Sequence, residues 1–277
     1  MEEQRSFGKT GAGYDREGFA AYLRNLERSP NTISAYLHAV SEFFSEEPEF
    51  SQEAVLRYKQ GLSGRAKATT VNLRLCGLRT YAQYMQLPVL VKPIKIQKVP
   101  FAENVISQAD YQKLLEGLAG DQNWKWYFLV KFLACTGARI SELLQFRKKH
   151  LDDGYMELWT KGKIRMVYFP AKLLEESRDY YTGLGEDEFL FQGKKGALAS
   201  RTVGVMFYKF SEKYGIPKKT MHPHSFRHRF AVNFLKKNND ISLLADIMGH
   251  SNVNTTMIYL RLSKEEQRNA VDCVVDW

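Results

Sequence analysis

Hydrophobic residues recur at helical spacing through most of the chain. Between positions 71 and 85 they are spaced by four, three, four and three residues, which places them on one face of a helix: Val71, Leu75, Leu78, Ala82 and Met85. This regular apolar face predicts a helix that packs into a core.

Start signals accompany several of the helical patterns. Ser29 followed by Pro30 has the form of an N-cap with proline at the first helical position. Ser51 precedes a second apolar pattern, and Ser107 with Asp110 resembles a capping box. Further helices are expected through 128–133, from Arg139, and from about positions 171, 201, 225, 241 and 263.

One segment changes from helical to strand periodicity. Residues Tyr155–Trp159 and Ile164–Phe169 flank the turn Thr160-Lys161-Gly162-Lys163, which predicts a β-hairpin. The expected fold class is therefore mainly α, with a helical N-terminal domain and an α-rich second domain that contains a small β-hairpin.

The length of 277 residues is sufficient for two domains. Pro93 and Pro100 interrupt the helical pattern in a basic stretch, which favours an extended linker. We expect a leader at 1–13, a helical domain at 14–88, a linker at 89–104, and a second domain at 105–277 with a C-terminal helix at 263–277.

Composition restricts the class of protein. The chain has 40 Lys and Arg against 31 Asp and Glu, a net charge of +9, which suggests a polyanionic partner. Three scattered cysteines, without a CxxC pair, indicate free thiols in a reducing cytoplasm. The N-terminus lacks an apolar signal, and the longest apolar stretch, Tyr127–Cys135, is too short to span a bilayer.

Charge is distributed unevenly in the first half. No acidic residue occurs between Glu53 and Glu103. A phosphate backbone would neutralise this span, so we expect it to contact DNA, with a solvated surface as the alternative. Arg74 and Arg79 lie off the apolar face of their helix and are expected to reach the DNA. The candidate DNA-binding residues are Arg57, Lys59, Arg65, Lys67, Arg74, Arg79, Lys92, Lys95 and Lys98.

Candidate chemistry lies in the second half. Arg139 follows an expected helix end, His224 and Arg227 are three residues apart at an expected helix start, and His250 precedes Tyr259 by nine residues. Residues three apart share a helix face and can address one ligand. With Lys161 of the hairpin, these side chains predict a cationic pocket that contains one candidate nucleophile.

This set suits attack on a phosphodiester. Arginine binds two non-bridging oxygens at once as charge builds at phosphorus. A tyrosine nucleophile must lose a phenolic proton, which a neighbouring histidine or the cationic field can promote. The leaving 5′-oxygen needs a proton, which a lysine on a hairpin can deliver.

The order and spacing of these residues resemble the tyrosine recombinase (phage integrase) family, in particular its short Xer-like members. The matching strings are Thr-Gly-Ala-Arg-Ile-Ser-Glu-Leu at 136–143, the hairpin Lys-Gly, His-Ser-Phe-Arg at 224–227, Gly-His at 249–250 and the tyrosine that follows. Thr160 stands where the family usually has glycine, and Lys163 is a second lysine nearby. The resemblance implies catalytic roles for Arg139, Lys161, His224, Arg227, His250 and the nucleophile Tyr259.

The resemblance also implies partners and an activity. The chain would be a cofactor-independent, site-specific recombinase that acts in integration, excision, inversion or dimer resolution through a 3′-phosphotyrosine. Its partner would be double-stranded DNA with specific sites. It would be a monomer or weakly associated in solution and a homotetramer on paired sites, with residues 263–277 passed to a neighbouring protomer or packed on their own domain.

Alternative interpretations remain for the individual residues. Arg139 and Glu142 could form a helix ion pair, Lys161 could serve the turn alone, and Tyr259 could be a core aromatic. A metal site at His222, His224 and His228 lacks a supporting Cys or carboxylate cluster, so no metal is expected. The competing functions are a type IB topoisomerase and a non-catalytic DNA-binding regulator.

Overall fold

A computed structural model describes residues 14–96, 104–160, 163–194, 196–249, 256–259 and 272. The chain divides into two compact units, Met1–Lys98 and Val99–Trp277. The expected leader at 1–13, Lys98, Lys161, His250 and nearly all of the expected C-terminal helix lie outside the described residues.

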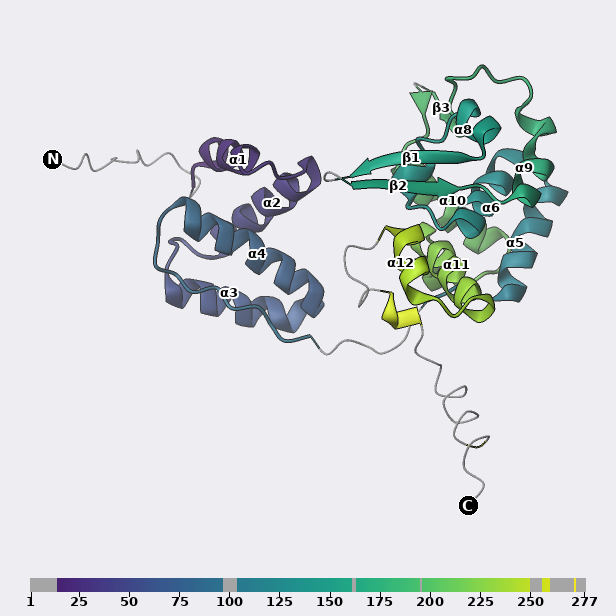
Figure 1. Ribbon diagram of the computed structural model, residues 1–277. Coiled ribbons are helices and arrows are strands. Elements are labelled where there is room, and N and C mark those ends of the chain that lie inside the picture. Colours follow the sequence, from purple (N-terminus) through teal and green to yellow (C-terminus); the bar gives the residue numbers. More distant parts are fainter. Residues whose placement is uncertain are drawn as a thin grey trace. The chain divides into compact units, whose positions relative to one another are not determined.

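The described residues of unit 1, 14–96, form four helices (Figure 1). They are α1 (Arg16–Asn25), α2 (Pro30–Glu46), α3 (Gln52–Arg65) and α4 (Ala68–Tyr84). The side chains of Ser29 and Ser51 accept hydrogen bonds from backbone N–H groups at the starts of α2 and α3, as expected for N-caps. The apolar face of α4 is buried, with Val71, Leu75 and Leu78 at most 1% exposed.

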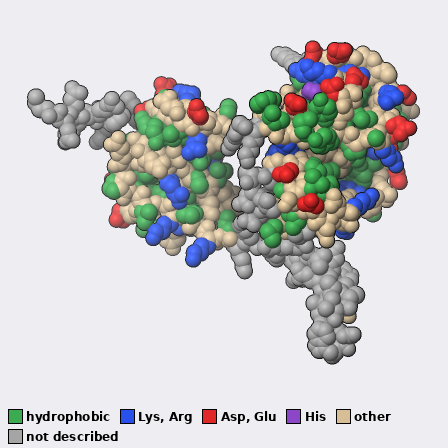
Figure 2. All heavy atoms as spheres, in the orientation of Figure 1, with side chains coloured by type: hydrophobic (Ala, Val, Ile, Leu, Met, Phe, Trp, Pro, Cys, Tyr) green, Lys and Arg blue, Asp and Glu red, His purple; other side chains and the backbone are tan. Residues whose placement is uncertain are grey.

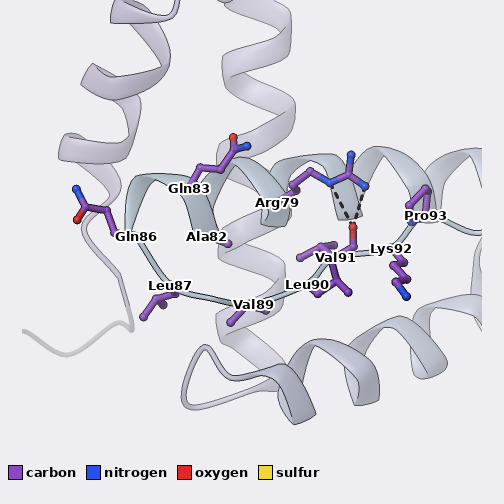
Figure 3. A pocket seen from close by; sticks show the side chains of 10 residues that line it. All are labelled: Arg79, Ala82, Gln83, Gln86, Leu87, Val89, Leu90, Val91, Lys92 and Pro93. Carbon is purple, nitrogen blue, oxygen red and sulfur yellow. Dashed lines mark hydrogen bonds between the residues drawn. The ribbon is translucent and has the colours of Figure 1, made fainter.

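The segment after α4 runs back along unit 1 without regular secondary structure. The Gln52 side-chain amide donates to the carbonyl of Leu90 and accepts its N–H, and Asn72 pairs with both backbone groups of Ile94 in the same way. Arg79 donates twice to the carbonyl of Val91, at 3.2 and 2.8 Å (Figure 3). Part of the expected linker is therefore fixed to unit 1 by side chains of α3 and α4.

Unit 2 has an aromatic and aliphatic core surrounded by helices. Its first helices are α5 (Gln108–Gly120), α6 (Trp124–Thr136), α7 (Ile140–Leu143) and α8 (Lys148–Asp153). After the hairpin come α9 (Ala171–Ser177), η1 (Asp179–Tyr181), β3 (Gln192–Gly193), β4 (Gly196–Ala197), α10 (Ser200–Lys213), η2 (Lys218–Thr220), α11 (Pro223–Lys237), α12 (Ile241–Met248) and η4 (Met257–Tyr259). The predicted fold class, mainly helical with a small hairpin, is confirmed.

Strands β1 (Tyr155–Thr160) and β2 (Lys163–Tyr168) form the antiparallel hairpin. Leu158 pairs with Arg165, and Val167, on the same side of β2, is 1% exposed. The opposite face carries the pair Trp159 and Ile164, whose exposed fractions are 74% and 55%. One face of the hairpin is therefore packed on unit 2 and the other is open.

Candidate active site

Arg227 is the most deeply buried charged side chain of the described site, at 1% exposure. Helix α11 begins at Pro223, where Nδ1 of His222 accepts the N–H of Ser225, and places Arg227 in its second turn. The guanidinium donates to the carbonyls of Gly137 and Met248, at 2.5 and 2.6 Å. Burial and the positive charges of Arg139 and Arg165 lower the pKa of Arg227 to about 10.

The sequence folds locally to supply those carbonyls. Helices α6 and α12 both end at a left-handed glycine, Gly137 with φ +62° and Gly249 with φ +61°. A Cβ on Gly137 would lie 2.4 Å from the Phe230 ring. Arg227 therefore binds the C-terminal ends of two helices, where partial negative charge gathers.

Arg139 is the N-cap residue of α7 and is partly exposed, with 42% of its side chain accessible. It donates to Glu142 at 2.7 Å and to the carbonyl of Gly249 at 3.1 Å. Arg139 therefore forms the ion pair with Glu142 that was considered as an alternative to a catalytic role, and the same side chain also faces the candidate active site. An ion pair of this kind does not exclude a phosphate contact, because guanidinium has five N–H donors.

Glu142 also binds Arg165, which the sequence analysis did not identify. Arg165 donates from Nη1 to both carboxylate oxygens of Glu142, at 2.7 and 2.8 Å, and from Nε to the carbonyl of Ile247. Burial alone would raise the pKa of Glu142, but the Arg139 N–H and the charge of Arg165 outweigh it and lower the pKa. Glu142 therefore stays ionised and links Arg139 to the hairpin.

A cavity of about 500 Å³ lies beside these arginines. The starts of α7, α10 and α11 meet at it, so helix dipoles add to the positive potential of its wall. Burial and the charge of Arg227 lower the pKa of His224, which favours the neutral imidazole there. The lining residues include Arg139, Ser141, Ser200, His222, His224 and Arg227.

Tyr259 lies in η4 and is 8% exposed. Its ring packs in an apolar cluster with Ala231 of α11 and Leu244 and Met248 of α12. In Figure 1, α11 and α12 lie side by side, with η4 (yellow) below them. The Tyr259 hydroxyl is 2.6 Å from Nδ1 of His228. Burial raises the pKa of Tyr259, and Arg227 opposes that rise.

The structure brings together part of the predicted site. Arg139, His224 and Arg227 line one cavity. Tyr259 is hydrogen-bonded to His228 of α11, the helix that also carries His224 and Arg227. Lys161 and His250 lie outside the described residues, although their neighbours Thr160 and Gly249 do not. Within the described ranges, no group of three or more His, Cys, Asp or Glu could hold a metal ion.

The basic residues of unit 1 divide into paired and unpaired sets. Arg57, Arg65 and Arg74 form ion pairs with Glu47, Glu46 and Glu42, respectively. Glu42 and Glu46 lie in the last turns of α2 and Glu47 directly follows it. All three precede the acid-free span in the sequence, so they relieve much of its expected charge repulsion.

The remaining basic residues differ in exposure and contacts. Lys59 donates to the carbonyl of Lys92 at 2.8 Å. Lys67, Lys92 and Lys95 are exposed, and no ion pair joins them to any residue that the structure describes. Figure 2 shows Lys and Arg side chains (blue) at several places on the visible face of unit 1.

In the described part of the chain, no helix is both long and apolar enough to cross a bilayer. A second cavity, of about 330 Å³, lies in unit 1 between the end of α4 and the segment held by Arg79 (Figure 3).

The family follows from comparison with known proteins. The model of the phage integrase family matches residues 104–266. The chain belongs to the phage integrase family. The predicted resemblance to tyrosine recombinases is thereby confirmed.

Relatives match nearly the whole chain. A tyrosine recombinase of Pseudothermotoga lettingae is 29% identical over 279 residues, covering 92% of this chain and 96% of that protein. The tyrosine recombinase XerA of Pyrococcus furiosus is 28% identical over 267 residues, covering 92% of each. The TnP I resolvase of Bacillus thuringiensis is 26% identical and covers 92% of this chain and 97% of its own.

Solved structures share the fold. The XerH site-specific recombinase, in a post-cleavage complex with a palindromic difH substrate, has a TM-score of 0.71 at 20% identity. That match covers 91% of this chain and 84% of the other. The crystal structure of XerA recombinase has a TM-score of 0.53 at 24% identity and covers 95% and 98%.

Proposed function

We propose that this protein is a site-specific DNA recombinase that cleaves and rejoins DNA strands through a phosphotyrosine at Tyr259. The observation that carries this function is the tyrosine held against the helix whose His224 and Arg227 line a cationic cavity. A phosphodiester in that cavity would meet arginine donors and helix N-termini, which stabilise the charge that develops at phosphorus. The family match and the recombinase relatives support the same activity.

Each proposed residue has a separate role. Arg139 and Arg227 bind non-bridging phosphate oxygens, and His224 donates or accepts a hydrogen bond at the cavity wall. Lys161 protonates the leaving 5′-oxygen, and His250, which follows Gly249 in the sequence, is a further catalytic residue. Both roles rest on the family pattern in the sequence. No metal or nucleotide is needed in this scheme, since the phosphotyrosine retains the energy of the bond.

Double-stranded DNA is the proposed partner, and a homotetramer on paired sites is the proposed active assembly. The solved recombinase XerH is bound to a DNA substrate, which supports the first of these. Unit 1 and the first part of the linker would then grip the DNA while unit 2 cuts it. A type IB topoisomerase would use the same chemistry without strand exchange. The nearly full-length match to recombinases favours a recombinase over a topoisomerase.

Covalent capture tests the function. A duplex that the protein selects from a random-sequence pool is nicked at successive positions, so that cleavage releases a short fragment and traps the enzyme. We expect an adduct that joins a 3′-phosphate to the peptide containing Tyr259, formed in excess EDTA and without ATP. A strict requirement for magnesium in the covalent step, or an adduct on another residue, would contradict the proposal.

Salt dependence tests the DNA contacts of unit 1. Alanine in place of Lys67, Lys92 or Lys95 should flatten the slope of log affinity against log salt concentration by about one unit in each variant. A protein that contacts one phosphate fewer releases about one counterion fewer when it binds DNA. Arg74→Ala provides a matched comparison and should leave the slope unchanged. Arg74 was expected from the sequence to reach DNA, but it is paired with Glu42 and its side chain is 15% exposed. Unchanged slopes in the three lysine variants would indicate that this basic span is a solvated surface that does not contact DNA.

A further inference from the structure

Among the residues that the structure describes, His228 makes a polar contact with the candidate nucleophile. Its Nδ1 lies 2.6 Å from the Tyr259 hydroxyl, and the two ring centroids are 5.2 Å apart. A proton acceptor must lie within about 2.6–3.2 Å of the group it deprotonates, and this pair meets that condition. His228 is absent from the pattern that identified the other candidate residues.

The position of His228 on α11 connects the tyrosine to the cavity. Arg227 and His228 lie three and four positions after His224, so each of them is a neighbour of His224 on the surface of the helix. The rings of His224 and His228 are 4.3 Å apart and perpendicular to within about 20°. The bond to His228 therefore keeps the phenol oxygen beside the face that carries His224 and Arg227.

The surroundings of Tyr259 create a need for a base. Its ring lies among apolar side chains of α11 and α12, and burial raises its pKa, so the phenol stays protonated at neutral pH. Arg227 favours the phenolate, and His224 is the other titratable group on this face of α11. From α12, Leu244 and Met248 belong to the buried apolar cluster that contains this ring, and Ile241 packs against that cluster.

We infer that His228 accepts the Tyr259 proton when the strand is cut. The Tyr259 O–H bond breaks as the Nδ1–H bond forms, and the phenolate oxygen bonds to phosphorus as the P–O5′ bond breaks. The leaving oxygen takes its proton from the general acid, proposed above as Lys161. On rejoining, the neutral general acid takes the proton of the 5′-hydroxyl as its oxygen bonds to phosphorus, the bond between phosphorus and the Tyr259 oxygen breaks, and His228 returns its proton to Tyr259. This inference rests on the proposed function and assigns a catalytic residue to it.

The test compares side chains that differ in basicity but not in position. Asparagine places an amide atom close to where histidine has Nδ1, so His228→Asn can hold the phenol but cannot take its proton. In single-turnover trapping, we expect His228→Asn to form the adduct about 10²-fold more slowly than the wild type. DNA affinity and thermal unfolding should be unchanged, and His228→Gln serves as a second variant if asparagine disturbs folding.

A more acidic nucleophile provides the decisive readout. A fluorinated tyrosine at position 259 loses its proton more readily than tyrosine does. With this nucleophile, the ratio of the adduct-formation rates with His228 and with His228→Asn should fall at least several-fold. A purely structural role of His228 would slow both nucleophiles equally. His150→Asn is the matched control, because His150 accepts an N–H through Nδ1 in α8 and does not line the cavity.

The outcomes separate two failures. If the wild type forms the adduct and His228→Asn forms it equally fast, or if fluorination leaves the ratio of rates unchanged, His228 is not the proton acceptor and the recombinase function stands. If the wild type forms no adduct on any nicked duplex, the proposed function and the role of His228 are both overturned.

Discussion

A Tyr259→Phe variant is expected to bind its DNA site with unchanged affinity and to form no covalent adduct. Phenylalanine preserves the ring that packs against Ala231, Leu244 and Met248, and removes only the hydroxyl and its bond to His228. Loss of the nucleophile should reduce the rate of cleavage by at least about 10⁴-fold, as in other enzymes that lose a covalent nucleophile. Gel analysis of the trapped complex measures the adduct.

Tyr214→Phe is the appropriate control for this experiment. Tyr214 also donates its hydroxyl to one partner, Asp121 at 2.6 Å, but lies away from the cavity lining. It should form the adduct at the wild-type rate. An adduct in Tyr259→Phe would show that another residue attacks phosphorus, and an unchanged biological effect of that variant would favour the non-catalytic regulator instead.

The second large effect is expected at Arg227. Arg227→Lys keeps the charge but not the planar fork that reaches both Gly137 and Met248. At least one buried carbonyl would lose its donor, which costs about 1–3 kcal/mol of unfolding free energy. Cleavage should slow by about 10²–10³-fold, the usual effect of removing one donor from a developing oxyanion.

Urea unfolding and single-turnover trapping measure the two effects of Arg227→Lys separately. Arg178→Lys is the control, since Arg178 is exposed at the end of α9. If Arg227→Lys is destabilised but cleaves at the wild-type rate whenever it is folded, Arg227 serves the packing of α11 alone. An equal loss of cleavage rate in Arg227→Lys and Arg178→Lys would mean that the assay reports a non-specific effect of arginine substitution.

Features set by neighbouring residues were predictable from the sequence. The N-caps Ser29, Ser51 and Ser107 act within one helical turn, and all three accept the expected backbone N–H. The hairpin was predicted to within a residue or two, because its turn and strands are adjacent in the chain. Arg139, His224 and Arg227 could be proposed as site residues because each lies in a short string with a recognisable family pattern.

Features set by distant residues were not predictable in this way. Alternation along β2 would place Ile164, Met166 and Tyr168 inward, whereas the structure turns Arg165 and Val167 toward unit 2. The buried Arg165 depends on Glu142, which lies 23 residues earlier. Likewise, the glutamates that pair with Arg57, Arg65 and Arg74 lie at positions 42–47, before the acid-free span, so the span appeared more strongly charged than it is.

The role of His228 was missed for a related reason. In the sequence it stands between Arg227 and Arg229 and appeared only as one of three histidines without metal ligands nearby. Its partner Tyr259 is 31 residues away. The signal that could have found it is the spacing of four from His224 on a helix, which places both imidazoles on one face.

The exposed tryptophan of the hairpin makes the protein spectroscopically convenient. All four tryptophans follow residue 98, so tryptophan emission reports on unit 2 alone and tyrosine signals dominate unit 1. Of the tryptophans that the structure describes, Trp159 is 74% exposed, Trp124 42% and Trp126 7%, so among these a water-soluble quencher would suppress the hairpin emission most strongly. The strand that leads to Lys161 therefore contains a native fluorophore, and DNA or protein that covers it would be visible by its protection from quenching.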